Sequence, residues 1–180
     1  FRKMGSSMVA GFAGLFAVQQ VFQIIKDGIE VVQKFEQQMA NVKAITGATA
    51  TEFKFLTDSA KELGSTTIFT ATQVGQLQEE LSKLGFSTGE ILASSEAILQ
   101  LAQATGSDLA EASVVAGATL RGFGLEASDM QEVVDVMAKS FTSSALDMEK
   151  FKESMKLVAP IAKTTETSLQ DASAALSILA

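Results

Sequence analysis

Apolar side chains recur at intervals of three and four along the N-terminal part of the chain, which predicts one long amphipathic helix over residues 6–46. Part of this stripe keeps a heptad spacing, which favours packing against another helix. The candidate self-association stripe consists of Phe22, Ile25, Ile29, Val32, Phe35 and Met39. Glu36 takes the next heptad position and shifts the register, so docking on the chain's own domain is an equal alternative. Gly47 is expected to end the helix.

This helix begins with a run of apolar and glycine residues, MVAGFAGLFAV at residues 8–18, preceded by two basic residues. Such a run resembles the front of a signal peptide or membrane segment, but it is too short to cross a bilayer. Extending it takes in three glutamines, so a buried or self-associating helix is favoured over membrane insertion. The candidate membrane-contact residues are Met8, Val9, Phe12, Leu15 and Phe16.

Beyond residue 47 the pattern changes to short apolar stripes separated by polar joints. At each joint a side-chain oxygen stands three residues before Glu or Gln, which is the spacing of a helix capping box. The capping residues are Thr49, Thr70, Ser87, Asp108, Ser128 and Thr167. Stripes are followed by Gly64, Gly85 and Gly106, where a left-handed residue would end a helix.

These starts and stops predict short helices that are each too short to be stable alone and must pack on one another. They cover residues 50–63, 71–84, 88–105, 108–121, 129–141, 146–159 and 168–180. Pro160 is expected to end or kink its helix, and Phe123, between two glycines, to fill the core. The even spacing of the joints matches no known repeat signature, so we attribute it to similar helix lengths.

The predicted fold is therefore all-α, with a long N-terminal helix over residues 1–46 and a compact array of short capped helices over residues 47–180. The length of 180 residues and the 47% hydrophobic content allow one good core and do not demand two. Because the chain starts at Phe1 and stops within an apolar stripe at Ala180, we expect it to be part of a longer polypeptide.

Composition excludes several classes of function. The sequence has no Cys and no His, which excludes disulfides, the usual zinc sites and His-dependent catalysis. The formal charge of −7 repels nucleic-acid phosphates, and no basic patch or aromatic stacking pattern indicates a nucleic-acid surface. Only carboxylate pairs, Lys chemistry or a carboxylate-bound cation remain for catalysis. We expect no catalytic residue, no metal and no cofactor.

The remaining candidates for chemistry are better explained as structure. Ser87 and Glu90 could be a nucleophile and its base, but a complete capping box with its apolar staple accounts for both. The candidate carboxylate pairs are Glu79 with Glu80, Glu149 with Glu153, and Asp129 with Glu132. They lie on helix faces beside Lys or Ser and are interpreted as solvated surface.

The order of several segments resembles the core domain of phage tail tape measure proteins. The similarity begins with FEQQMANVKAITG at residues 35–47 and includes LGSTTIFTA at 63–71, LGFSTGEI at 84–91 and LVAPIA at 157–162. It runs from about Phe35 to the end of the chain. One departure is LSKL at residues 81–84, where a more alanine-rich helix end is typical of the family.

The resemblance implies a structural, non-enzymatic protein that lies in the lumen of a phage tail tube, sets tail length during assembly and takes part in DNA ejection. It implies homo-oligomers, contacts with tail tube and tail tip proteins, and proximity to DNA without specific binding. The apolar residues 8–18 would then suit association between copies or contact with the host membrane on ejection. A membrane-active, toxin-like helical protein and a tail-embedded lytic enzyme using Glu79, Glu80 or Glu149 are the alternatives.

Overall fold

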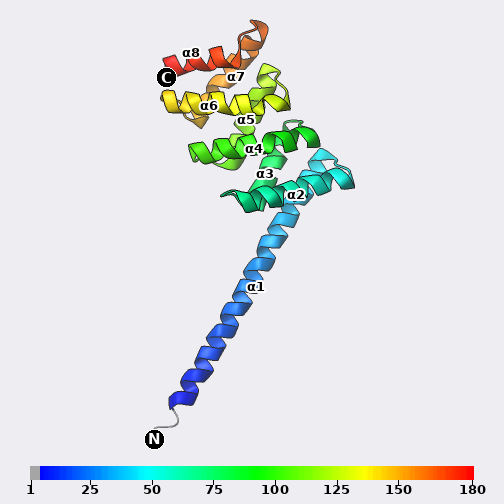
Figure 1. Cartoon of the computed structure of the whole chain (residues 1–180), viewed down its shortest axis with the longest axis vertical. Coiled ribbons are helices and arrows are strands. Elements are labelled where there is room, and N and C mark those ends of the chain that lie inside the picture. Colours follow the sequence, from blue (N-terminus) through cyan, green and yellow to red (C-terminus); the bar gives the residue numbers. More distant parts are fainter. Residues whose placement is uncertain (1–4) are drawn as a thin grey trace. The chain divides into compact units, whose positions relative to one another are not determined.

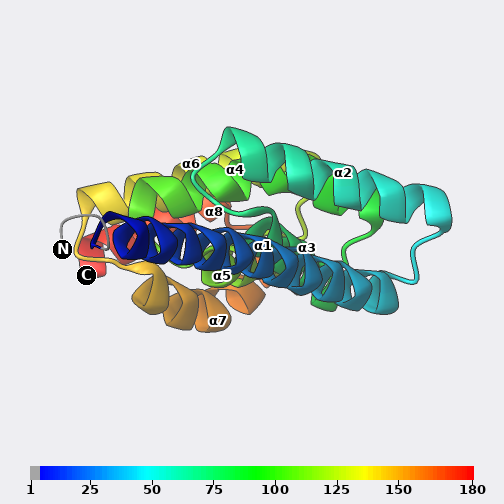
Figure 2. The same ribbon diagram turned by 90° about the horizontal axis from the view of Figure 1, so that it is seen from below.

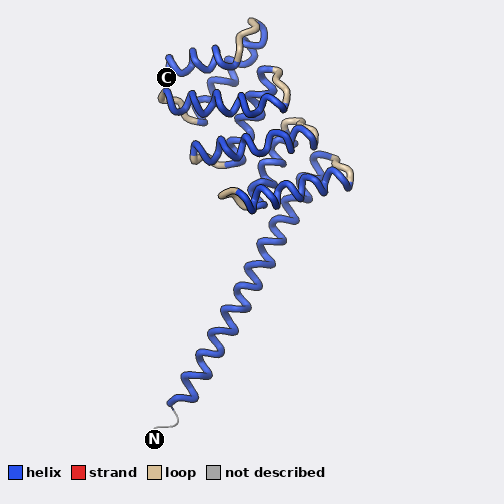
Figure 3. The backbone as a smooth tube through the Cα atoms, viewed as in Figure 1, coloured by secondary structure: helices blue, strands red, loops and turns tan. Residues whose placement is uncertain are grey.

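The computed structural model of the chain describes the backbone of residues 5–180 and the side chains of residues 26–180. The described chain consists of helices joined by short loops and contains no strand (Figure 3). It divides into two units, residues 1–37 and residues 38–180. The first helix, α1 (Gly5–Thr46), supplies most of the first unit, and its last turns belong to the second. The prediction of an all-α fold is confirmed.

Each short helix expected from the sequence is present, followed in one case by a 3-10 turn. The helices are α2 (Ala50–Thr66), α3 (Ala71–Lys83), α4 (Thr88–Thr105), α5 (Leu109–Phe123), η1 (Ala127–Asp129), α6 (Met130–Ser143), α7 (Met148–Thr164) and α8 (Leu169–Leu179). Their apolar stripes form the core of the second unit. Fully buried side chains include Leu56, Leu77, Leu81, Ile98, Leu101, Leu120, Met130 and Phe151.

Capping boxes begin α2, α3 and α4, as the spacing predicts. At α4 the Ser87 Oγ accepts a hydrogen bond from the Glu90 backbone N–H at 3.4 Å, and a Glu90 carboxylate oxygen accepts one from the Ser87 N–H at 2.8 Å. Thr49 and Thr70 form the same pair of bonds with Glu52 and Gln73. Two backbone donors that have no partner within each helix are thereby satisfied.

The predicted caps at the later joints are partly wrong. Asp108 does cap α5, and its carboxylate accepts from two backbone N–H groups. Ser128 instead lies inside the 3-10 turn η1, and α8 is capped by Ser168 rather than Thr167. Ser168 pairs with Asp171, three residues on, so the same box spacing occurs one residue later. Thr167 and Ser168 both carry a hydroxyl that could cap α8, and the helix begins after Ser168.

Gly47, Gly85 and Gly106 have φ angles of 63°, 79° and 67° and follow helix ends, as expected. Gly64 does not end a helix, because α2 continues to Thr66. A Cβ atom at Gly64 would lie 2.4 Å from the backbone nitrogen of Ala71. This glycine is therefore needed for the close approach of α2 to the start of α3.

Packing overturns two further expectations, namely that a helix ends at Pro160 and that Phe123 fills the core. Pro160 does not end α7, which continues to Thr164. Pro160 and Lys156 are exposed, so water can satisfy the Lys156 carbonyl that lacks its partner, while buried Ala159 and Ala162 hold the helix on its neighbours. Phe123 is half-buried rather than central. It lies in the last turn of α5, one turn after Leu120, which occupies the core.

Helices α2 to α8 form a two-row stack. One row contains α2, α4, α6 and α8, the other contains α3, α5 and α7, and the main contacts of each helix are with helices one or two places along the chain. Successive helices rise through the unit from α2 to α8 (Figure 1), and a view along that direction separates α2, α4 and α6 from α5 and α7 (Figure 2). The even spacing of the joints therefore accompanies a repeated packing arrangement, as in helical repeat proteins, rather than similar helix lengths alone.

Candidate functional site

The joint between α3 and α4 holds the residues that most resembled an active site. The Arg121 guanidinium of α5 donates a hydrogen bond to Glu90 at 2.8 Å and lies 4.2 Å from the centroid of the Phe86 ring. Glu90 thus accepts from the Ser87 N–H, the Ser87 hydroxyl and Arg121. Phe86 is buried beneath the guanidinium. The joint ties the start of α4 to the end of α5.

The electrostatics of this joint oppose base catalysis by Glu90. Hydrogen bonds from the Ser87 backbone and hydroxyl, followed by that from Arg121, hold the pKa of Glu90 below its usual value of 4.5. A carboxylate stabilised in this way is a weak base near neutral pH, and its hydrogen bonds support the cap and bind Arg121 of α5. In the described part of the chain, Ser87 bonds to Glu90 in the capping box, which favours the structural interpretation of the pair.

A second cluster connects the last turns of α1 with α3. The Gln38 amide donates to a Glu79 carboxylate oxygen at 2.6 Å and to the Gly75 carbonyl at 3.2 Å. Lys83 lies 2.8 Å from both Glu79 and Glu80. The hydrogen bond from Lys83, with smaller ones from Gln38 and Asn41, lowers the pKa of Glu79, while the two carboxylates raise the pKa of Lys83. The two carboxylates of the predicted pair therefore share one lysine in a surface ion-pair cluster.

The other predicted pairs are also divided between structural partners. Asp129 accepts from the Glu126 N–H at 2.9 Å, while Glu132 accepts from the Gln170 amide of α8. Glu153 forms an ion pair with Lys156 at 2.5 Å, and this lowers the pKa of Glu153. Among the residues that the structure describes, no cluster of three or more His, Cys, Asp or Glu could hold a metal ion.

The described part of the self-association stripe differs along its length. Ile29 and Val32 are each 54% exposed, Phe35 is half-buried, and Met39 is buried in the second unit beside Gly75 of α3. Phe22 and Ile25 lie outside the residues whose side chains are described. Met39 is therefore committed to packing within the chain, and self-association through the rest of the stripe stays a prediction.

The candidate membrane-contact residues, Met8, Val9, Phe12, Leu15 and Phe16, also lie outside the described side chains. Within the part of the chain that the structure describes, no helix combines the length and apolar character needed to span a bilayer. Membrane contact by these five residues stays a prediction.

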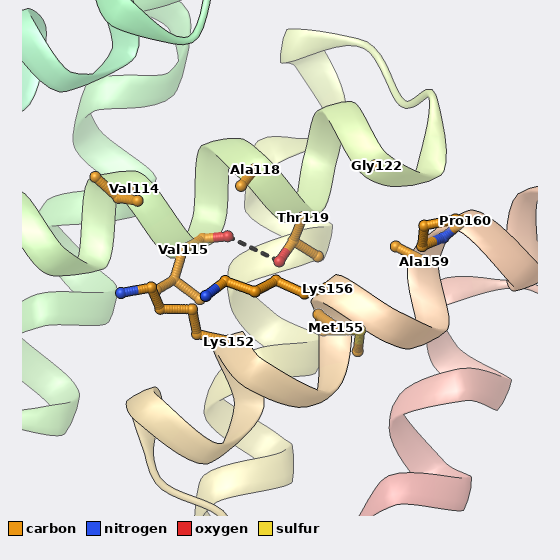
Figure 4. A pocket seen from close by; sticks show the side chains of 10 residues that line it. All are labelled: Val114, Val115, Ala118, Thr119, Gly122, Lys152, Met155, Lys156, Ala159 and Pro160. Atoms are coloured by element: carbon orange, nitrogen blue, oxygen red, sulfur yellow. Dashed lines mark hydrogen bonds between the residues drawn. The ribbon is translucent and has the colours of Figure 1, made fainter.

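A shallow pocket of about 230 Å³ lies in the seam between α5 and α7 (Figure 4). Val115 and Ala118 of α5 and Met155 and Ala159 of α7 supply its apolar walls, and Lys152 and Lys156 approach it from α7. The Thr119 hydroxyl in this seam donates to the Val115 carbonyl at 2.7 Å. The sequence placed these residues within the expected helices 108–121 and 146–159 without identifying the seam, because the pairing of α5 with α7 is a tertiary contact.

The sequence is similar to a family of phage tail proteins and to one phage tape measure protein. Residues 57–180 match the model of a family described as phage-related minor tail protein. The chain is also 37% identical over 152 residues to the tape measure protein of Pneumococcus phage Dp-1. That similarity covers 84% of this chain and 13% of the relative. No solved structure matches the chain. The family match covers more than half of the sequence and includes every helix from α3 to α8, so this chain belongs to the phage-related minor tail proteins, which are structural proteins of the phage tail.

Proposed function

We propose that this chain is part of a tape measure protein that lies in the lumen of the phage tail tube, sets the tail length during assembly and takes part in DNA ejection. The observation that carries the proposal is the similarity to the tape measure protein of phage Dp-1, which is 37% identical over 84% of this chain. The chain spans 13% of that relative, so these roles belong to a whole protein of which this is one region.

The physical chemistry of the chain supports a position in the lumen. A net charge of −7 disfavours adhesion to DNA that passes through the tube, and exposed lysines such as Lys34, Lys54 and Lys156 are paired with carboxylates. The described ionisable groups stabilise helix starts and surfaces. Tail tube and tail tip proteins would be the partners, with DNA near but not specifically bound.

Tail length in virions tests the ruler role directly. Duplicating roughly 28 residues within α1, about eight helical turns, adds about 42 Å at 1.5 Å per residue. We expect electron micrographs to show tails longer by a similar amount. A variant of unchanged length, Val31→Ser, should leave the tail length unchanged, since Val31 lies outside the self-association stripe. Tails of wild-type length on virions that contain the duplicated protein would contradict the proposal.

Copies of the chain would associate through the exposed part of the stripe on α1. Ile29 and Val32 lie one turn apart on the same face of the helix, and both expose apolar surface to water. We expect light scattering to detect oligomers that Ile29→Ser with Val32→Ser weakens. Val31→Ser is the matched control, since Val31 is 63% exposed but lies on another face. A monomeric wild-type chain, or equal effects of both variants, would contradict this role.

A further inference from the structure

Within each row of the stack, a helix packs against the next helix of the same row, as α3 does against α5 and α5 does against α7. The pair α5 and α7 shows how close this cover is. Val115 and Thr119 of α5 are buried in the seam, and a Cβ atom on Gly122 would lie 3.0 Å from the Cβ of Ala159 on α7. Apolar and small residues on α5 are therefore matched to the surface of α7 (Figure 4).

The equivalent cover is missing on α7. Leu157 and Ile161 are 73% and 63% exposed, and Ile178 and Leu179 of α8 are 85% and 84% exposed. Between the two helices lies an open groove of about 270 Å³. Its walls include Val158, Ile161, Ala172, Ala175, Leu176 and Leu179. Ile161 and Leu179 line this groove, while Leu157 and Ile178 are exposed on the same two helices. Exposed aliphatic surface of this kind usually receives a partner.

The chemistry of this groove suits an amphipathic helix better than a charged ligand. Its walls are mainly aliphatic, with Thr165, Thr167 and Asp171 as the polar members, and include no Lys or Arg. The carboxylate among them, Asp171, accepts a hydrogen bond from Ser168 as part of the α8 cap. An anionic lipid headgroup or a phosphate would find no cation there. A helix with aliphatic residues at intervals of three and four would bury Ile161 and Leu179 together.

We propose that the α7–α8 groove receives a further helix of the same polypeptide, in the next position of the row formed by α3, α5 and α7. Two observations select this occupant. Contacts of α3 with α5 and of α5 with α7 build the row, and the groove lies beside α7, the last described helix of that row. The relative from phage Dp-1 is long enough to continue the stack, because the matched region is 13% of its length. The proposal concerns packing and does not depend on the role in tail length.

Thiol accessibility tests this proposal, because the chain contains no Cys and a single introduced thiol reports one position. Ile161→Cys and Leu179→Cys place a thiol on opposite walls of the groove. Ile68→Cys is the control, since Ile68 is 72% exposed in the loop before α3, at the other end of the stack. Each variant is made in the 180-residue chain and in the full-length phage protein, and its reaction rate with a maleimide is measured.

We expect the thiols at positions 161 and 179 to react at least tenfold more slowly in the full-length protein, independently of protein concentration, while the thiol at position 68 keeps its rate. Equal rates in the two proteins would overturn the proposal. Protection of the 180-residue chain that grows with its concentration would assign the groove to a second copy. Protection that requires phosphatidylglycerol vesicles would assign it to a membrane, and slowing at all three sites would indicate aggregation. Each of these outcomes overturns a helix of the same polypeptide as the occupant.

Discussion

The start of α4 and the start of α8 use the same local chemistry but differ in tertiary support. Both begin with a Ser whose hydroxyl caps the helix and an acidic residue three positions later. At α4 the acidic residue also binds Arg121 of α5, and buried Phe86 lies beneath that guanidinium. At α8 the corresponding Asp171 pairs with its own Ser168, and the helix ends in exposed Ile178 and Leu179. A cap determines where a helix begins, whereas long-range contacts determine how firmly it is held.

The largest contrast should come from truncating apolar side chains in the two regions. Leu81 is fully buried in α3, whereas Leu179 is 84% exposed. We expect Leu81→Ala to lower the free energy of unfolding by about 2–5 kcal/mol through lost burial and a residual cavity. Leu179→Ala should change it by less than about 0.5 kcal/mol in this chain. Urea unfolding followed by circular dichroism measures both, and similar losses would show that α8 is as well packed as α3.

Alanine substitutions of two glycines test how closely α4 and α5 are packed. A Cβ at Gly117 of α5 would lie 2.7 Å from Leu84 Cδ1 and 3.0 Å from Leu81 Cδ2. We expect Gly117→Ala to cost about 1–3 kcal/mol by overpacking. Gly89, in the first turn of α4, has no neighbour within 4 Å of an added Cβ. Gly89→Ala should therefore stabilise the chain by about 0.5 kcal/mol through helix propensity. Thermal unfolding measures whether each variant is less or more stable than the wild type. An unchanged stability of Gly117→Ala would contradict the close packing.

Removing the two Ser caps should separate local from global stability. We expect Ser87→Ala to lower the free energy of unfolding by about 1 kcal/mol, because α4 is integral to the stack. Ser168→Ala should mainly increase hydrogen exchange at the amides of α8, since an end helix can open without the rest of the chain. If Ser168→Ala accelerated exchange throughout α3 to α5, α8 would be part of the same cooperative unit.

The smallest effect should come from the charge of Glu90. Gln at the same position of a box begins α3, so Glu90→Gln keeps the cap and removes the ion pair with Arg121. We expect a loss below about 1 kcal/mol at pH 7, since the pair is partly exposed. Because folding lowers the pKa of Glu90, its contribution is present above about pH 4.5 and is lost as the pH falls through the folded value. Urea unfolding at pH 7 and pH 3 checks this, and an equal difference at both pH values would contradict it.

Much of the fold could be predicted from the sequence because the signals are local. The boxes at Thr49, Thr70 and Ser87 involve atoms within four residues of one another, and Gly85 and Gly106 end helices through their own φ angles. The same locality explains why Ser87 and Glu90 could be assigned to a cap. It could not show that Arg121, distant in sequence, also binds Glu90.

The errors occurred where nonlocal packing selected among local options. Two neighbouring residues could each cap α8, and the structure uses Ser168. Gly64 had the position of a helix stop, but the approach of Ala71 gives it a different role. Pro160 had the chemistry of a helix end, yet α7 continues past it because its buried face is held by the stack. The sequence next to Ser168, Gly64 and Pro160 does not indicate the tertiary contacts that decide these three cases.

The sequence by itself determined the helical class, the places where most helices begin, the lack of His and Cys chemistry and the resemblance to a tail protein family. The first three follow from hydrogen bonds and periodicity within a few residues, or from composition, whereas the resemblance rests on the order of particular segments between residues 35 and 162. Only the tertiary structure decided that the helices form two rows, that Met39 is buried in the second unit, and that one apolar groove is left open between α7 and α8. Such properties depend on which helix faces meet, and an apolar stripe specifies that a face is buried without specifying its partner.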